Sequence, residues 1–225
     1  MQTTRIGRKT AQEPIRLTRL RFINGGRMVA RGQKRNYAVI FDLEFTAWEG
    51  SMESRWTRPG ELTEVVQIGA VKLDSANLRE VDCFDMLVRP RVNPVLSDYL
   101  VALTGITNLA MDRRGVDFAV AYRAFLDFVG EARIFAHGRD DLILAANLKL
   151  YGWGRSLAMP DYSNAIHWFT AQGLDLKGKR ACDVAELTGA VFEGRKHDAL
   201  ADARGVAAGF IALIGKGAPN PFLAQ

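Results

Sequence analysis

Acidic side chains and one histidine occur at three places in the chain, in types and spacings that could build a metal centre. In chain order the residues are Asp42 and Glu44, the adjacent Asp140 and Asp141, and His197 and Asp202. Carboxylates that gather at one site repel one another and raise each other's pKa, so such a group stays ionised only beside cations. Oxygen ligands in this number suit Mg²⁺ or Mn²⁺, the metals of phosphoryl transfer.

The first and last motifs need different local structure to bring their side chains together. Asp42 and Glu44 lie at the end of an apolar, β-branched run that predicts a buried strand, on which positions i and i+2 point to one face. His197 and Asp202 lie five positions apart, about 140° around a helix, and so do not share one helix face. They converge if His197 lies in a loop, Asp198 caps the helix and Asp202 points inward one turn later.

Two adjacent acids compete for the middle position. If the helix that follows begins near Asp141, this residue shares the apolar face of Leu144, Ala145 and Leu148, which would meet the sheet. Asp140 would then sit at the N-cap and serve the backbone. We therefore favour Asp141 over Asp140 as the ligand. The alternative for all the acids is that they are helix caps and surface charges; it is disfavoured because acids beside predicted core elements need a partner or a metal.

The predicted elements place each motif at the edge of a core segment. Strands are predicted first, and helices alternating with two short strands follow, which indicates an α/β fold with a mixed sheet flanked by helices. The strands are residues 37–43, 64–73, 81–88, 133–136 and a short extended piece around 162–166. The helices are residues 97–103, 117–129, 141–151, 182–188 and 199–214.

Basic residues are concentrated at the N-terminus. Residues 1–36 hold ten Arg or Lys against one Glu, a net charge of +9, which leaves −4 for the rest of a chain whose total is +5. A basic arm suits a polyanionic partner, because each Lys or Arg near a phosphate releases counterions. Two alternatives remain, an unstructured leader and upstream sequence before a start at Met28. An Arg-rich transit segment is disfavoured because residues 1–36 contain no serine.

Composition excludes several classes of protein. The chain is 48% hydrophobic and 24% charged, as in ordinary globular proteins, and it has no run of about 18 apolar residues that could span a membrane. Cys83 and Cys182 lack metal-ligand spacing and are expected to be reduced, and no signal-peptide core is present, so we expect a cytoplasmic protein. We predict a flexible basic extension at 1–36, one domain at 37–215 and a tail at 216–225.

From about residue 37 to residue 214 the chain resembles the DEDDh 3′→5′ exonucleases of the ribonuclease H-like superfamily. The motifs are Asp42-x-Glu44, Asp141 and His197-x4-Asp202. A longer stretch, residues 89–99 (RPRVNPVLSDY) followed by LTGIT, is similar to the branch that contains enhanced-RNAi exonucleases and KapD-like proteins. His137-Gly138 stands where members often have Trp-Gly, which could alter nucleotide stacking.

The resemblance implies a five-stranded mixed sheet and a two-metal mechanism. Asp42, Glu44, Asp141 and Asp202 would hold two Mg²⁺ or Mn²⁺ ions, and His197 would be the general base. The expected product is a nucleoside 5′-monophosphate released from a free 3′ end. By similarity, the backbone around Phe45, Thr46, Gly105 and Ile106 would line the pocket for the terminal nucleotide, with stacking from Phe45 or Trp48.

The leading hypothesis is a metal-dependent 3′→5′ exonuclease that acts on single-stranded nucleic acid, with RNA favoured. One rival is a DNA-directed, proofreading-type exonuclease, because the metal site does not distinguish the sugars. The other is a non-catalytic, nuclease-like protein that binds or regulates nucleic acid. This alternative is disfavoured because all five residues expected to take part in catalysis are present: Asp42, Glu44, Asp141, His197 and Asp202.

Overall fold

The computed structural model describes residues 36–154 and 156–223 of the 225-residue chain. The predictions for the basic arm, including the alternative start at Met28, concern residues that lie almost wholly outside the described ones. None of the described helices is long and apolar enough to cross a membrane. Cys83 is an exposed free thiol and Cys182 a buried one.

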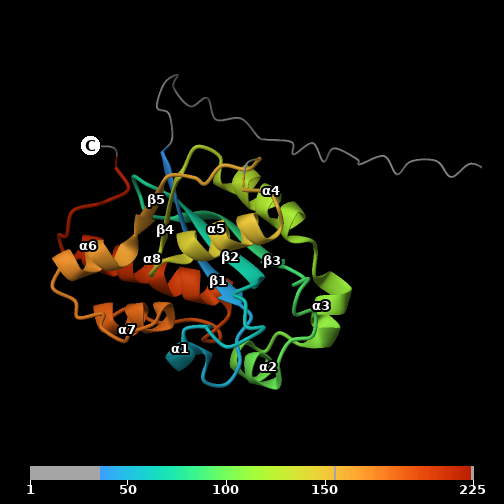
Figure 1. The fold of residues 1–225 in the computed structure, drawn as a ribbon. Coiled ribbons are helices and arrows are strands. Elements are labelled where there is room, and N and C mark those ends of the chain that lie inside the picture. Colours follow the sequence, from blue (N-terminus) through green and yellow to red (C-terminus); the bar gives the residue numbers. More distant parts are fainter. Residues whose placement is uncertain (1–35, 155, 224–225) are drawn as a thin grey trace, which may run out of the picture. The chain divides into compact units, whose positions relative to one another are not determined.

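A five-stranded mixed sheet lies at the centre of the domain, in the strand order β3-β2-β1-β4-β5 (Figure 1). Strands β1, β2 and β3 pair antiparallel, whereas β4 is parallel to β1 and β5 is parallel to β4. The predicted α/β class and five-stranded mixed sheet are therefore confirmed. The strands are β1 Tyr37–Phe45, β2 Val65–Asp74, β3 Glu80–Leu87, β4 Arg133–Ala136 and β5 Tyr162–Asn164.

Helices cover both faces of the sheet (Figure 1). Those predicted from the sequence lie within two residues of their expected bounds, while three short ones, α1, α3 and α6, were not predicted. The helices are α1 Ser51–Ser54, α2 Asp98–Thr104, α3 Asn108–Arg114, α4 Phe118–Val129, α5 Asp140–Leu150, α6 Ala165–Ala171, the 3₁₀ turn η1 Ala181–Asp183, α7 Val184–Thr188 and α8 Ala199–Gly215.

The central strand β1 is buried on both faces, and its alternation decides where its two acids point. Val39 and Phe41 belong to the apolar cluster formed with α4 and α5. Ile40 belongs to the opposite cluster, which is formed with α6 and α8. Because side chains alternate along a strand, Asp42 and Glu44 continue the face of Ile40. Both carboxylates therefore lie on the side of the sheet that α8 covers.

The first turn of α8 lies directly on strand β2. A Cβ atom built at Gly69 would stand 2.1 Å from the backbone nitrogen of Leu200, so only glycine leaves room for the helix. The Gln67 side chain adds two bonds at the same point: its carbonyl accepts from the Ala199 N–H (3.1 Å), and its amide donates to Asp198 (3.2 Å). These contacts hold the start of α8 against the sheet.

A buried carboxylate organises the segment that leads into α2. Glu64 accepts hydrogen bonds from the backbone N–H groups of residues 91, 92 and 93 (2.7–2.9 Å) and from the Tyr151 hydroxyl (2.6 Å). Burial alone would raise the pKa of Glu64, but these hydrogen bonds outweigh it and lower the pKa. The segment ends in Ser97, which caps α2 by accepting from the Leu100 N–H.

The residues after α8 return to the core. Phe222 is buried, and its ring lies 5.1 Å from that of Phe135 and 5.0 Å from that of Phe210, centroid to centroid. Asn220 donates to the Ser75 carbonyl. The predicted tail at 216–225 thus packs on the domain over its described part, while the domain boundaries themselves stay predictions.

Candidate active site

A cavity of about 290 Å³ opens at the end of β1 that carries the two acids. One part of its wall is polar and the other is apolar and aromatic. The polar part is formed by Asp42, Glu44, His137, Asp140, Lys179, Arg180, His197 and Asp202. The apolar part includes Leu43, Phe45, Ala47, Met52, Trp56, Tyr99, Leu100 and Leu103.

Four carboxylates converge on the polar part from three elements. Asp42 and Glu44 come from β1, Asp140 is the first residue of α5, and Asp202 lies in the first turn of α8. All four residues are buried: Asp42 is 8% exposed, Glu44 7%, Asp140 9% and Asp202 3%. Acidic residues are almost never this buried without a partner, so their convergence needs a chemical explanation.

The structure corrects the choice of the middle acid. Helix α5 begins at Asp140, with Arg139 as its N-cap, so the buried face runs through Asp140, Leu144 and Leu148. Asp141 is turned about 100° away, the angle of one helix residue. It pairs with the Arg139 guanidinium through two hydrogen bonds (2.8 and 2.9 Å) and lines a separate cavity of about 540 Å³. The sequence suggested that Ala145 lies on the buried face, but Ala145 is exposed and Asn147 is buried, so the face that meets the core includes Asp140 and not Asp141.

The two neighbouring acids also differ electrostatically. The Arg139 guanidinium lowers the pKa of Asp141, as expected for an ion-paired carboxylate. Burial, and then the charge of Asp141, raises the pKa of Asp140 to about 7. A raised pKa in a cavity of converging acids is typical of a functional site, whereas a lowered one beside an arginine is typical of a surface ion pair.

The remaining acids of the cluster are perturbed in the same direction. Burial is the main cause, and the neighbouring carboxylates add to it. The pKa of Asp42 is raised well above its ordinary value, that of Glu44 to about 8 and that of Asp202 to about 7. Without a cation these groups therefore cannot all be ionised at neutral pH.

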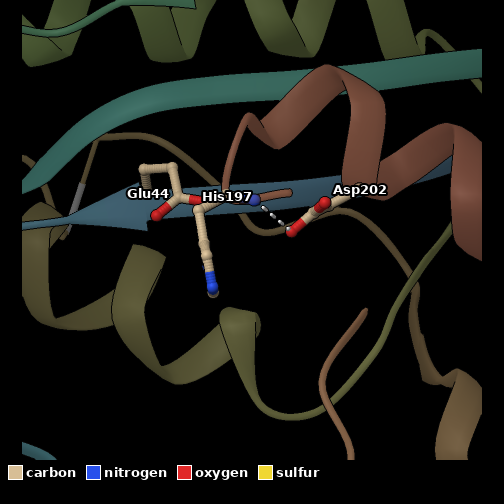
Figure 2. A group of neighbouring side chains, drawn as sticks. All are labelled: Glu44, His197 and Asp202. Atoms are coloured by element: carbon tan, nitrogen blue, oxygen red, sulfur yellow. Dashed lines mark hydrogen bonds between the residues drawn. The ribbon is translucent and has the colours of Figure 1, made fainter. Parts of the chain in front are cut away.

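The arrangement of oxygen atoms fits divalent cations. The Oδ2 atom of Asp140 and the Oδ1 atom of Asp202 are buried and have no hydrogen-bond partner among the described residues. One ligand atom each from Glu44, His197 and Asp202 lies within 4.8 Å of the other two. Figure 2 shows these three side chains meeting from β1, from the loop before α8 and from α8 itself. Buried, unpartnered carboxylate oxygens are the ligands that Mg²⁺ and Mn²⁺ prefer.

His197 lies in the loop that precedes α8, in the left-handed backbone region (φ +65°). Asp198 caps the helix by accepting from the Ala201 N–H, and Asp202 follows one turn later. The His197 N–H points at the Asp202 carboxylate (3.3 Å, dashed in Figure 2). Burial, and then the charge of Arg180, lowers the pKa of His197, so its ring is neutral at neutral pH.

The four residues expected around the terminal nucleotide lie in different places. Of Phe45, Thr46, Gly105 and Ile106, only Phe45 is among the described residues that line the cavity. Thr46 is buried behind it, where its hydroxyl accepts from the Glu64 N–H. Gly105 ends α2, and Ile106 packs in the small core beneath α2 and α3. The expected backbone contacts with a terminal nucleotide stay a prediction.

Aromatic side chains that sequence reasoning missed complete the apolar wall. The ring of Trp56 lies 5.4 Å from that of Phe45, and its indole N–H donates to the Thr46 carbonyl (2.8 Å). Trp56 stands in a polar loop with no periodic pattern, so nothing in its sequence context pointed to the cavity. Trp48, which was expected to stack, is not among the lining residues of the described chain.

Two arginines that were also missed hold the His197 loop in place. Arg180 lies 2.9 Å from the His197 ring, measured from Nη1 to Nε2. Arg195 donates to the carbonyls of Ala102 and Leu103 at the end of α2 (2.9 and 3.3 Å). The basic runs KGKR and GRK around them were a visible signal, but basic residues alone do not indicate which one meets a histidine.

This fold and this site define a member of the Exonuclease family, whose model matches residues 39–210. The match covers more than half of the 225-residue chain, so the chain belongs to that family. The predicted exonuclease family is thereby confirmed.

Curated relatives match over parts of their length. The human protein "3'-5' exoribonuclease 1" is 36% identical over 78 residues, which are 35% of this chain and 21% of the relative. The "3'-5' exonuclease eri1" of Schizosaccharomyces pombe is 28% identical over 116 residues, which are 50% of this chain and 36% of the relative. The matches thus span about a fifth and about a third of these two relatives.

Solved structures confirm the fold. The nuclease domain of 3'hExo, described as a DEDDh family member bound to rAMP, superposes with a TM-score of 0.67 at 23% identity, covering 82% of this chain and 94% of that one. Cell-death related nuclease 4 (CRN-4) superposes with a TM-score of 0.66 at 25% identity, covering 82% and 65%.

Proposed function

We propose that this protein is a metal-dependent 3′→5′ exonuclease that hydrolyses single-stranded nucleic acid, with RNA favoured, to nucleoside 5′-monophosphates. The observation that carries the proposal is the convergence of four buried carboxylates and one histidine on a cavity with an aromatic wall. The family and the names of the relatives, which are exoribonucleases and exonucleases, support the reaction class and the preference for RNA.

The four converging carboxylates would form the metal-binding group. Asp42, Glu44, Asp140 and Asp202 would hold two divalent ions, Mg²⁺ or Mn²⁺, with Asp140 in the place that the sequence had suggested for Asp141. Bound there, such ions supply an activated water and offset the charge that develops on the phosphate. The protein contributes four oxygen donors from rigid elements, so the ligands are oriented before the ions arrive.

His197 is suited to the role of general base. Its ring is neutral at neutral pH, because burial and Arg180 lower its pKa. It can therefore take a proton from the attacking water as the water oxygen bonds to phosphorus and the bond to the leaving 3′-oxygen breaks. The hydrogen bond from the His197 N–H to the Asp202 carboxylate connects the loop to the acidic cluster.

The aromatic wall would hold the 3′-terminal base. Phe45, Trp56 and Tyr99 offer flat apolar surfaces next to the acids. Stacking of bases on aromatic rings tolerates any base, because every base has a π-face. This fits a nuclease that shortens strands of mixed sequence from the end.

Two further parts of the proposal concern the rest of the chain. We infer a domain at residues 37–215, a basic extension at 1–36 that contacts nucleic-acid phosphates, and a short C-terminal tail at 216–225. We also infer a cytoplasmic location. It is supported by the free thiols Cys83 and Cys182, which suit a reducing compartment.

Oligonucleotides labelled at the 5′ end test the proposed activity. The purified protein is given RNA and DNA of one sequence, with the 3′ end either free or blocked, in Mg²⁺ or Mn²⁺. We expect a ladder of shortened RNA only from the free 3′ end, no digestion in EDTA, and slower digestion of DNA. Faster digestion of DNA would favour a proofreading-type enzyme, and binding without digestion would favour a non-catalytic protein.

A further inference from the structure

One contact in the cavity blocks the proposed base. The Arg180 Nη1 atom lies 2.9 Å from the His197 Nε2 atom. A guanidinium group can only donate, so Nε2 must accept through its lone pair, and the ring proton must sit on Nδ1. A nitrogen whose lone pair already accepts this hydrogen bond cannot at the same time take a proton from water. In the structure His197 is therefore engaged by Arg180.

The backbone of Arg180 is fixed while its side chain faces solvent. The Arg180 N–H donates to the carboxylate of Asp183, the last residue of η1 (3.0 Å). The side chain lines the cavity and is exposed. A guanidinium on a fixed backbone can change partners by rotating its side chain alone.

Arg180 differs from the neighbouring cation Lys196 in its partners. Lys196 is held by Asp183 and Glu186, at 3.4 and 3.7 Å. Within the described part of the chain, Arg180 makes no such ion pair with a carboxylate, and its partner is the uncharged imidazole of His197. It is thus available to an incoming anion in a way that Lys196 is not.

We propose that Arg180 binds the phosphate of the 3′-terminal nucleotide and that this exchange of partners releases His197. The inference rests on the proposed function. A phosphate group is charged, and two of its oxygens accept parallel hydrogen bonds from a guanidinium, so it is a stronger partner than a neutral ring nitrogen. When the phosphate arrives, Nε2 loses its donor and its lone pair becomes free for the attacking water. Substrate binding thereby makes the base available.

Nuclear magnetic resonance of the full chain, with ¹⁵N-labelled histidine, tests the exchange directly. AMP is the probe, adenosine is the control without phosphate, and Ca²⁺ is the added metal. We expect the His197 Nε2 resonance of the wild type to shift on addition of AMP and to remain in place with adenosine. In Arg180→Ala the resonance should already lie near the released position and respond little to AMP.

Two further variants test whether the AMP response depends on the contact between Arg180 and His197 or only on a nearby positive charge. Lys177→Ala removes one positive charge from the same loop at an exposed residue that is not among those lining the cavity, so it should keep the wild-type response to AMP. Arg180→Lys keeps the charge but loses the planar pair of donors, so it should respond only in part. An unchanged AMP response in Arg180→Ala, or a loss of response in Lys177→Ala, would overturn the proposal.

Binding and turnover add a readout that a purely structural role would not move. We expect Arg180→Ala to weaken AMP binding by about tenfold, the usual effect of one charge-assisted contact, and to leave adenosine binding unchanged. For an RNA oligonucleotide, KM should rise about as much, while kcat changes far less than in His197→Ala. Equal loss of adenosine and AMP binding would contradict phosphate recognition. If the wild type digests nothing, the proposed function fails, but the resonance and AMP experiments still decide the role of Arg180.

Discussion

Asp42 on strand β1 pairs in register with Gly69 on strand β2, and the missing side chain at Gly69 is what lets helix α8 reach the acids of β1. The first turn of α8 carries Asp202, and the loop before it carries His197. A glycine in the middle of a strand therefore decides whether residues 160 positions apart can form one site. The residues around it lead to testable predictions.

Gly69→Ala should disturb both the fold and the site. Its Cβ would lie 2.1 Å from the Leu200 nitrogen and 2.2 Å from the Ala199 carbonyl carbon, and backbone atoms cannot yield as flexible side chains do. We expect a loss of about 1–3 kcal/mol in the free energy of unfolding, the usual cost of overpacking, and a larger loss of activity because Asp202 moves with α8. Urea unfolding and RNA digestion measure the two effects.

The control for this substitution is Gly215→Ala at the other end of helix α8. A Cβ there meets nothing within 4 Å, so the substitution should leave activity intact and stabilise the protein slightly, by up to about 1 kcal/mol. Wild-type stability in Gly69→Ala would show that α8 does not depend on the close approach.

Asp140→Asn and Asp141→Asn should behave very differently although the residues are adjacent. Asp140 lies in the acidic cavity, and Asp141 pairs with Arg139 outside it. We expect Asp140→Asn to lose at least about a hundredfold in kcat with Mg²⁺, and Asp141→Asn to stay within a few-fold of the wild type. Single-turnover digestion at several Mg²⁺ concentrations measures this. The opposite ranking would restore Asp141 as the ligand.

The metal-free protein should lose stability as the pH rises. Folding raises the pKa of Asp140 and Asp202 to about 7 and that of Glu44 to about 8, so the folded state favours the protonated acids. Their contribution is complete below about pH 4, near the unfolded pKa values, and is lost as the pH rises through 7 to 8. Tm in EDTA should fall across this window, and Mn²⁺ should reverse the fall. If Tm changes neither with pH nor on addition of Mn²⁺, the acids do not share one site.

Glu64→Gln should destabilise the segment that leads to α2. The carboxylate accepts three backbone N–H groups and the Tyr151 hydroxyl, and hydrogen bonds to a charged group contribute about 1.5–3 kcal/mol each. We expect a loss of about 2–3 kcal/mol at pH 7 by urea unfolding. Because folding lowers the pKa of Glu64, its contribution is present above the unfolded value and shrinks as the pH falls below about 4. Tyr151→Phe, which removes one bond only, should cost less.

Trp56→Ala should weaken substrate binding rather than chemistry. Trp56 forms the aromatic wall with Phe45, and stacking on one base contributes about 1–3 kcal/mol. We expect KM for a short RNA to rise about tenfold or more, with kcat within a few-fold of the wild type. Trp48→Ala is the matched control, because Trp48 stands nearby without lining the cavity. An equal effect of the two variants would place the base elsewhere.

The sequence alone determined the strands, the longer helices, the family and most of the acids. Strand β1 was predictable because its β-branched run is buried on both faces, and α8 because Asp198 caps a long alanine-rich helix. These features are local, so neighbouring residues in the chain carry them. Asp42, Glu44, His197 and Asp202 could be predicted because each lies in one of these two elements or in the loop beside it.

Only the tertiary structure decided which acid of the adjacent pair enters the cavity, which aromatic rings line it and which arginine meets His197. The buried face of α5 holds Asp140 and the polar Asn147 while Ala145 is exposed, so the apolar pattern of the sequence pointed to the wrong side of the helix. Trp56 and Arg180 come from loops whose positions are set by distant contacts. The direction of a side chain depends on how the helices, strands and loops pack against one another. This packing involves residues far apart in the sequence, so the local spacing of residues does not predict it.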